Sequence, residues 1–196
     1  MTDLTRFRDF VQRMTRLVEA AGDDERRLLA EGKVLLADLL RHDDWLPAEF
    51  ATADAGRYQQ YLLHCDALER FSIVSFVWGP GQKTPVHDHT VWGMVGVLRG
   101  AEICEEFKRN ADTGRLEPAG KHRIEAGQVD LVSPAIGDIH RVSNALRDSP
   151  SVSIHVYGAN IGTLRRHFFD LPGGEAGEFI SGYSNDVIPN LWGPSA

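Results

Sequence analysis

Apolar residues in the first fifty positions recur at steps of three and four, which is the period of an α-helix. Residues 4–21 carry one apolar stripe of this kind, and residues 28–39 carry a second in which leucines cluster on one face. Gly22 is expected to end the first helix, and Asp23 or Asp24 to cap the second. Because neither stripe has a partner within this segment, both helices are expected to pack on the remainder of the chain.

The pattern changes at about residue 56. Short stretches rich in Val, Ile, Phe and Tyr then alternate with Gly and Pro, as in proteins with many short strands joined by turns. The expected strands are 58–63, 71–78, 87–98, 102–107, 128–132, 140–144 and 151–157. After Tyr157 the pattern is less regular, with a turn expected at 172–174 and a packed coil at 185–192. The predicted fold is mainly β, a sandwich or barrel preceded by a helical hairpin.

The length of 196 residues fits one domain with a sizeable core. We therefore expect residues 1–196 to form a single domain, with a helical segment at 1–50, a barrel core at 56–160 and a tail at 161–196 packed on the barrel. The sequence does not specify an oligomeric state.

Charge and composition narrow the class of protein. The formal net charge of −7 and the dispersed arginines argue against a nucleic-acid-binding surface. No apolar run approaches membrane-spanning length. The two cysteines are too few for a disulfide framework and fit a reducing compartment. A cytoplasmic protein with no nucleic-acid or membrane partner is expected.

The candidate chemistry lies in two histidine-bearing segments. The first contains His87 and His89, which in a strand point to the same face while Asp88 points away. The second contains His140 after a Gly/Pro turn. Three neutral imidazoles on one divalent ion leave coordination positions open and favour anionic ligands, among them a thiol that binds as its thiolate. Imidazole suits Fe, Ni, Cu and Zn alike, so these side chains do not specify the metal.

The spacing of both segments resembles the two cupin motifs. The first motif is matched by Gly81, His87, His89 and Gly100. The second, with one added residue before the proline and one after it, is matched by Gly127, Pro134, Gly137, His140 and Asn144. The resemblance implies a cupin fold, a jelly-roll β-barrel, with a metal held by the three histidines. Gly93 occupies the position of the first motif's usual Glu, so a three-histidine site without a carboxylate is expected.

Ser153, His155 and Tyr157 alternate along one predicted strand and so share one of its faces. In a barrel that face can be the metal cavity, where a Ser–His–Tyr chain can set the imidazole tautomer and direct the phenol at a bound ligand. The alternative is a strand whose polar face is turned to water. A serine-hydrolase interpretation is not favoured, because no acidic partner or nucleophile elbow accompanies Ser153.

Together with Trp78-Gly79, these features resemble the cysteine dioxygenase family over about residues 58–157. Residues 179–185 and 189–192 are similar to the tail of its bacterial members. The resemblance implies one Fe(II) per chain, with a small thiol and O2 as substrates. It also implies the metal ligands His87, His89 and His140, and the catalytic residues Ser153, His155 and Tyr157.

Two departures from the family pattern bear on the substrate. The mammalian members form a cysteine–tyrosine cross-link, but the position that would supply the thiol is Gly93, so Tyr157 is expected to be unmodified. The cysteine-selective members bind the substrate carboxylate with an arginine where this sequence has Gln60, an amide without charge. Arg165 or Arg166 can supply a positive charge from the tail, with a surface ion pair as the alternative for either.

The chain is therefore similar to the bacterial Gln-type 3-mercaptopropionate dioxygenases, with Gln60 and Arg166 as the substrate-binding residues. Three alternatives stay open. A cysteine dioxygenase would have to accept an ammonium group as well as a carboxylate. A non-catalytic cupin sensor or storage domain would not need the Ser–His–Tyr chain, and a Zn or Ni cupin isomerase would differ in its metal content.

Overall fold

The two apolar stripes form a helical hairpin in the computed structural model, which describes residues 3–171 and 173–193. Helix α1 spans Thr5–Ala21 and helix α2 spans Glu25–Leu40, followed by a short 3-10 helix, η1, at Ala48–Ala51. Gly22 ends α1 with a φ of 55°, a left-handed conformation that glycine adopts without a steric penalty. Asp24 caps α2, since its side chain accepts a hydrogen bond from the Arg27 backbone N–H.

The described residues beyond the helices contain eleven strands. They are β1 Gln59–Cys65, β2 Ser72–Trp78, β3 Val86–His87, β4 Gly93–Arg99, β5 Ala101–Arg109, β6 Leu116–Glu125, β7 Val129–Val132, β8 His140–Asn144, β9 Ser151–Tyr157, β10 Arg166–Asp170 and β11 Glu175–Phe179. The stretch expected as one strand at 87–98 is divided into β3 and β4, with residues 88–92 outside both.

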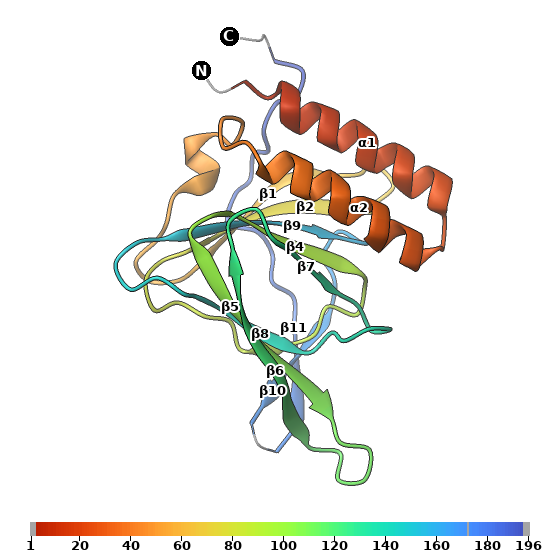
Figure 1. Ribbon diagram of the computed structural model, residues 1–196, viewed down its shortest axis with the longest axis vertical. Helices are drawn as coiled ribbons and strands as arrows, with labels where there is room; N and C mark the ends of the chain where they lie inside the picture. The colour runs from red at the N-terminus through yellow and green to blue at the C-terminus, as the bar shows by residue number, and fades with distance from the viewer. Residues whose placement is uncertain (1–2, 172, 194–196) are drawn as a thin grey trace.

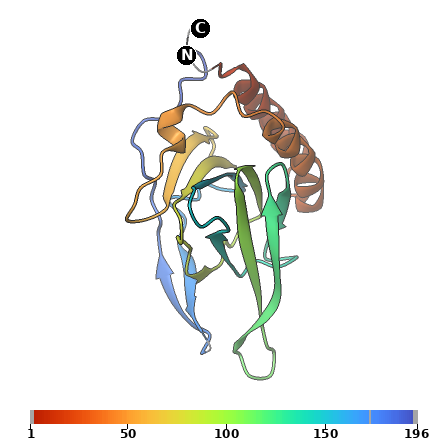
Figure 2. The same ribbon diagram turned by 60° about the vertical axis from the view of Figure 1, so that its left-hand side comes forward.

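The strands form two sheets (Figure 1). One has the order β1-β2-β9-β4-β7 and the other the order β11-β10-β3-β8-β5-β6. The mainly β cupin fold with an N-terminal helical pair is thereby confirmed, and its strands pair as two separate sheets that do not close into one continuous barrel. Figure 2 shows the helices on one side of the molecule and the long β5–β6 hairpin extending away from them.

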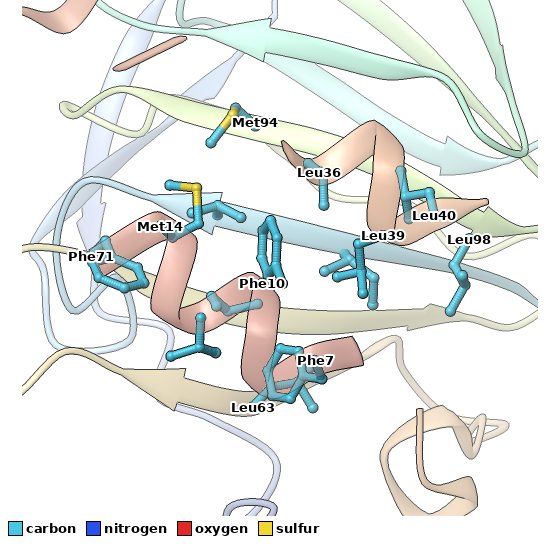
Figure 3. Packing of buried hydrophobic residues seen from close by; sticks show 14 of the residues in the cluster. Phe7, Phe10, Met14, Leu36, Leu39, Leu40, Leu63, Phe71, Met94 and Leu98 are labelled. Atoms are coloured by element: carbon cyan, nitrogen blue, oxygen red, sulfur yellow. The ribbon is translucent and has the colours of Figure 1, made fainter. Parts of the chain in front are cut away.

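The helices cover the outer face of the five-stranded sheet. One hydrophobic cluster joins residues of α1 and α2 to residues of β2, β4 and β9 (Figure 3). Along β9 it takes Val152, Ile154 and Val156. Since strand side chains alternate, Ser153, His155 and Tyr157 face the opposite side, toward the second sheet.

Three strands lie where none was expected. Strand β6 is an exposed edge strand that pairs only with β5, and most of its side chains face water, so its sequence lacks an apolar alternation. Strands β10 and β11 lie in the tail that was expected to be irregular. Strand β10 pairs with β3 through Phe168 opposite His87 and Phe169 opposite Val86. Backbone pairing with a segment eighty residues earlier holds this strand, and local periodicity does not report such a contact.

Two further expectations concerned the tail, a turn at 172–174 and a coil at 185–192. The turn at 172–174 includes Pro172, which lies outside the described residues, while Gly174 has a φ of 72°. Residues 185–192 contain neither helix nor strand, as expected, but the expected packing holds only for Pro189 and Leu191, since most of the other side chains are exposed.

Helix α2 lies close to β4 because Gly96 has no side chain. A Cβ at this position would lie 2.5 Å from Leu40 Cδ1 and 3.0 Å from Leu36 Cδ2. Leu36 itself is fully buried at this contact. The close approach of α2 to β4 therefore depends on Leu36 packing against the backbone at Gly96.

We expect Leu36→Ala to lower the free energy of unfolding by about 2–5 kcal/mol, because the smaller side chain leaves a cavity between α2 and β4 that the neighbouring side chains do not fill. Val34→Ala in the same helix is the matched control. Val34 is 65% exposed, and a surface change of this kind stays within about 0.5 kcal/mol. Urea denaturation of both variants measures the difference. Equal losses would contradict the packing described for α2.

Candidate metal centre and its cavity

Three buried histidines meet between the two sheets. His87 ends β3 and His140 begins β8, and the two residues lie directly opposite each other in the sheet. His89 follows two residues after His87 and is completely buried. One ring nitrogen of each lies within 4.8 Å of those of the other two. The structure thus brings together the three side chains that the sequence spacing selected.

His89 reaches this cluster through Asp138. His89 lies outside β3, so the expectation that strand alternation places His89 beside His87 is wrong. The His89 ring donates from Nδ1 to Asp138 Oδ1 over 2.9 Å. Asp138 Oδ2 accepts from the backbone N–H groups of His89 and Thr90, at 3.0 and 2.9 Å. One carboxylate therefore fixes both the loop and the ring. Asp88 faces the other way, as expected, and accepts from His167.

The outer nitrogens of all three rings have polar neighbours. His87 Nδ1 donates to the Pro85 carbonyl oxygen over 3.1 Å, and His140 Nδ1 lies 3.5 Å from Cys104 Sγ. With Nδ1 of His89 and His87 carrying the proton, Nε2 of each ring keeps its lone pair. Nε2 of His89 is buried and has no hydrogen-bond partner among the described residues. An unpartnered buried nitrogen in a three-imidazole cluster fits a divalent metal such as Fe(II).

Burial keeps the His87 and His140 rings neutral. Desolvation lowers the pKa of His87 to about 3 and the pKa of His140 well below its ordinary value. Burial acts to raise the pKa of Asp138, but hydrogen bonds from His89 and Thr90 outweigh it, and the net shift is downward. Asp138 is therefore an ionised partner behind the candidate ligand His89, a role that the sequence alone did not indicate. Its place two residues before His140 was the available signal.

Ser153, His155 and Tyr157 form one continuous hydrogen-bonded chain. Ser153 Oγ lies 2.8 Å from His155 Nε2, and His155 Nδ1 lies 2.7 Å from the Tyr157 hydroxyl. All three side chains are buried, so the alternative of a polar face turned to water is excluded for this strand. The Tyr157 ring stacks on the His89 ring with 5.2 Å between centroids. Burial lowers the pKa of His155 and raises the pKa of Tyr157, so both side chains are neutral.

A cavity of about 220 Å³ opens in front of the histidines. This is smaller than the roughly 300–1,000 Å³ of pockets that hold drug-sized ligands, so it suits a small molecule. His87, His140 and Tyr157 line it together with Gln60 and Arg166. No carboxylate of the described residues lines it, and Arg166 is the one permanently charged group among the lining side chains.

The two neighbouring arginines of the tail have different surroundings. Arg165 is 66% exposed and forms a surface ion pair with Glu178. Arg166 is only 4% exposed, donates from Nη2 to Ser181 Oγ over 2.7 Å and lies 4.6 Å from the Phe179 ring centroid. Its Nε has no partner among the described residues. The alternative of a surface ion pair therefore holds for Arg165 and is wrong for Arg166.

Gln60 and Gly93 complete the cavity region. Gln60 is half-buried on β1, and its side-chain amide donates to the Ser181 carbonyl oxygen over 3.3 Å. Gly93 lies opposite Tyr157 in the sheet, and a Cβ there would lie 2.8 Å from Tyr157 Cδ1. The tyrosine ring thus packs against bare backbone, and both cysteines are free thiols.

The fold and this cluster define a cupin with a candidate three-histidine metal centre. The model of the family described as "Cysteine dioxygenase type I" matches residues 10–170, which is most of the chain. The chain belongs to the cysteine dioxygenase type I family.

The individual relatives have low sequence identity to this chain. The protein is 28% identical over 118 residues to cysteine dioxygenase type 1 of Danio rerio, covering 58% of this chain and 56% of that protein. It is 26% identical over 171 residues to cysteine dioxygenase type 1 of Rattus norvegicus, covering 86% of this chain and 82% of that protein. The zebrafish match therefore spans little more than half of the relative's length.

Solved structures give general likenesses. A Klebsiella pneumoniae protein with a double-stranded β-helix domain has a TM-score of 0.44 at 17% identity, covering 62% of this chain and 95% of that chain. A cupin superfamily protein of Desulfitobacterium hafniense has a TM-score of 0.45 at 14% identity, covering 61% of this chain and 94% of that chain.

Among the described helices, none combines the length and the apolar character needed to cross a membrane.

We expect Asp138→Asn to weaken Fe(II) binding by about 10–100-fold, because His89 loses the anionic partner that orients its ring. Asp112→Asn is the control, since Asp112 lies in an exposed turn of the β5–β6 hairpin. Anaerobic Fe(II) titration of both variants measures the change. Parental affinity in Asp138→Asn would show that this carboxylate does not support a ligand.

Proposed function

We propose that this protein is a non-haem iron thiol dioxygenase that oxidises 3-mercaptopropionate to its sulfinic acid. The observation that carries the proposal is a small cavity beside the three-histidine cluster, lined by His87 and His140, that offers one guanidinium and no carboxylate among the described residues. The reaction adds both atoms of O2 to the sulfur of the thiol. Sulfur supplies all four electrons, so no external reductant is required. Fe(II), one per chain and held by His87, His89 and His140, would supply the site at which thiolate and O2 react.

Arg166 and Gln60 are the proposed carboxylate partners. The Arg166 side chain is held by Ser181 and by the Phe179 ring, and its unpartnered Nε belongs to the planar donor fork that pairs with carboxylates. Gln60 adds an uncharged amide that donates to the carbonyl oxygen of the same Ser181. Both side chains line the cavity that His87 and His140 also line. A mercapto acid can therefore place its thiolate at the histidines and its carboxylate at Arg166.

The same cavity disfavours an amino group. Cysteine differs from 3-mercaptopropionate by an ammonium group, which carries a full positive charge when bound. A buried ammonium requires a carboxylate or several acceptors, and the described lining residues include no carboxylate. The ammonium would also lie between a divalent metal and Arg166. The electrostatics thus favour an acid without an amine.

Tyr157 is the proposed proton donor to the bound ligand. Its phenol is neutral, lines the cavity and is held by His155 and Ser153 behind it. A neutral phenol can donate a hydrogen bond to an anion and stabilise charge that develops on it. A binding or sensor domain has no need of such a buried chain. This feature favours catalysis over passive binding.

Cysteine oxidation is the second candidate, because the relatives in the family carry the name cysteine dioxygenase. The test is sulfinate formation with a panel of thiols on iron-loaded protein. We expect kcat/KM for 3-mercaptopropionate to exceed that for cysteine by at least about tenfold, which needs only about 1.4 kcal/mol of differential transition-state binding. Equal or inverted constants would assign cysteine as the substrate. No oxidation of any thiol, or zinc or nickel in the purified protein, would reject the dioxygenase assignment.

The two adjacent arginines provide a matched test of the carboxylate anchor. We expect Arg166→Met to raise KM for 3-mercaptopropionate by about 10–100-fold, the usual effect of removing one charged hydrogen-bonding partner. Arg165→Met removes the same charge from the surface and is expected to leave KM unchanged. An equal effect of both variants would mean that overall charge, and not a contact in the cavity, is responsible.

A further inference from the structure

A completely buried carboxyl lies at the far end of the Ser–His–Tyr chain. Glu102 on β5 is 0% exposed, and it is not among the residues that line the cavity. Ser151 Oγ lies 3.4 Å from its Oε1, while Oε2 has no hydrogen-bond partner among the described residues. Its neighbours across the sheet are Ile124 on β6 and Asn144 on β8, neither of which is charged. A buried carboxyl in such surroundings has no cation to hold it ionised.

Glu102 is connected to the cavity through Ser153. Trp78 Nε1 donates to Ser153 Oγ over 3.2 Å, and both of these side chains also approach the Glu102 carboxyl as hydrogen-bonding groups. Burial raises the pKa of Glu102 to about 8, although hydrogen bonds with Ser153, Ser151 and Trp78 act to lower it. The carboxyl therefore carries its proton at neutral pH and loses it in mild alkali.

The proton on Glu102 determines how the chain of hydrogen bonds runs. A protonated carboxyl donates to Ser153, which already accepts from Trp78, so the Ser153 proton is left for His155 Nε2. A neutral His155 then carries its own proton on Nδ1 and donates to the Tyr157 oxygen. Tyr157 keeps its proton free to donate into the cavity.

Loss of the Glu102 proton exchanges donor and acceptor in each hydrogen bond of the chain. The Glu102 carboxylate accepts from Ser153, His155 donates from Nε2 to Ser153, and His155 Nδ1 accepts from the Tyr157 hydroxyl. Tyr157 then offers only a lone pair to the cavity, which repels an anionic ligand. Between the two arrangements the Glu102 O–H bond breaks and its proton goes to solvent, while the single proton of the neutral His155 ring moves from Nδ1 to Nε2.

We propose that Glu102 is a positioning residue whose carboxyl proton makes Tyr157 a hydrogen-bond donor toward the anionic ligand of the cavity. The consequence for catalysis rests on the proposed function. The effect on ligand binding and the titration of Glu102 do not depend on turnover.

The other buried titratable groups of β5 and β9 beside this chain do not change charge between pH 7 and 9. Burial raises the pKa of Cys104, on the same strand, to about 12. It lowers the pKa of His155 and raises the pKa of Tyr157, both on β9 and both away from this window. The facing residues of β2, β6 and β8, namely Trp78, Ile124 and Asn144, do not titrate. A change in ligand affinity that is specific to the Glu102 carboxyl can thus be isolated by substitution.

The test compares the parental protein with Glu102→Gln, whose side-chain amide donates to Ser153 at every pH. The dissociation constant of 3-mercaptopropionate is measured on anaerobic, iron-loaded protein at pH 7 and pH 9. A carboxyl with a pKa of about 8 changes from about nine-tenths to about one-tenth protonated over this range, so the parental affinity should fall about tenfold more than that of Glu102→Gln. The ionisation of the ligand itself is common to both proteins and cancels.

Two controls make the outcome specific. Glu125→Gln removes an exposed carboxyl on the neighbouring strand β6 and should retain the parental pH dependence. Ser153→Ala keeps Glu102 but disconnects it from His155, so it should remove the pH dependence as Glu102→Gln does. This second variant preserves the test if Glu102→Gln does not fold.

Infrared difference spectra of the iron-loaded protein follow the carboxyl directly. A protonated-carboxyl C=O band that disappears between pH 7 and 9 is expected in the parental protein. The band should disappear at higher pH in Ser153→Ala, which lacks a hydrogen bond that lowers the Glu102 pKa, and it should be absent from Glu102→Gln. Absence of the band in the parental protein, or an unchanged pH dependence in Glu102→Gln, would overturn the proposal. If the band and the binding change are present but no thiol is oxidised, the proposed function fails and the role of Glu102 stands.

Discussion

The arrangement of the site depends on how the helical hairpin packs against the five-stranded sheet. Val152, Ile154 and Val156 of β9 are buried under α1 and α2, in the same cluster as residues of β2 and β4. Because strand side chains alternate, this packing leaves the other face of β9 directed between the sheets. A slip of one residue would exchange the two faces and place the Ser–His–Tyr chain against the helices. The apolar contacts on one face thus secure the polar chain on the other.

Desolvation determines the charges inside the protein. The imidazoles of His87, His140 and His155 are neutral because burial disfavours their protonated forms. The two charged side chains in this region are both hydrogen bonded. Asp138 accepts from His89, and Arg166 donates to Ser181. The result is a small cavity whose fixed charge is positive. This distribution is the physical basis for proposing an anionic substrate without an amino group.

Groups behind the cavity control those that face it. Asp138 orients His89, the Pro85 carbonyl orients His87, and Ser153 holds His155, which in turn holds Tyr157. Each outer partner selects the tautomer of the ring in front of it. The chemistry available in the cavity therefore depends on residues that the ligand does not touch.

The sequence by itself determined the features that depend on local periodicity. These include both helices, the strands at 140–144 and 151–157, and the alternation that places His155 and Tyr157 on one face. Periodicity reports which residues share a face, but it does not report which distant segment covers that face or removes water from it. Only the tertiary structure decided that Asp138 holds His89, that Arg166 is buried while Arg165 is exposed, and that β10 pairs with β3. These features arise from contacts between segments remote in the chain, where desolvation and backbone pairing outweigh local preference.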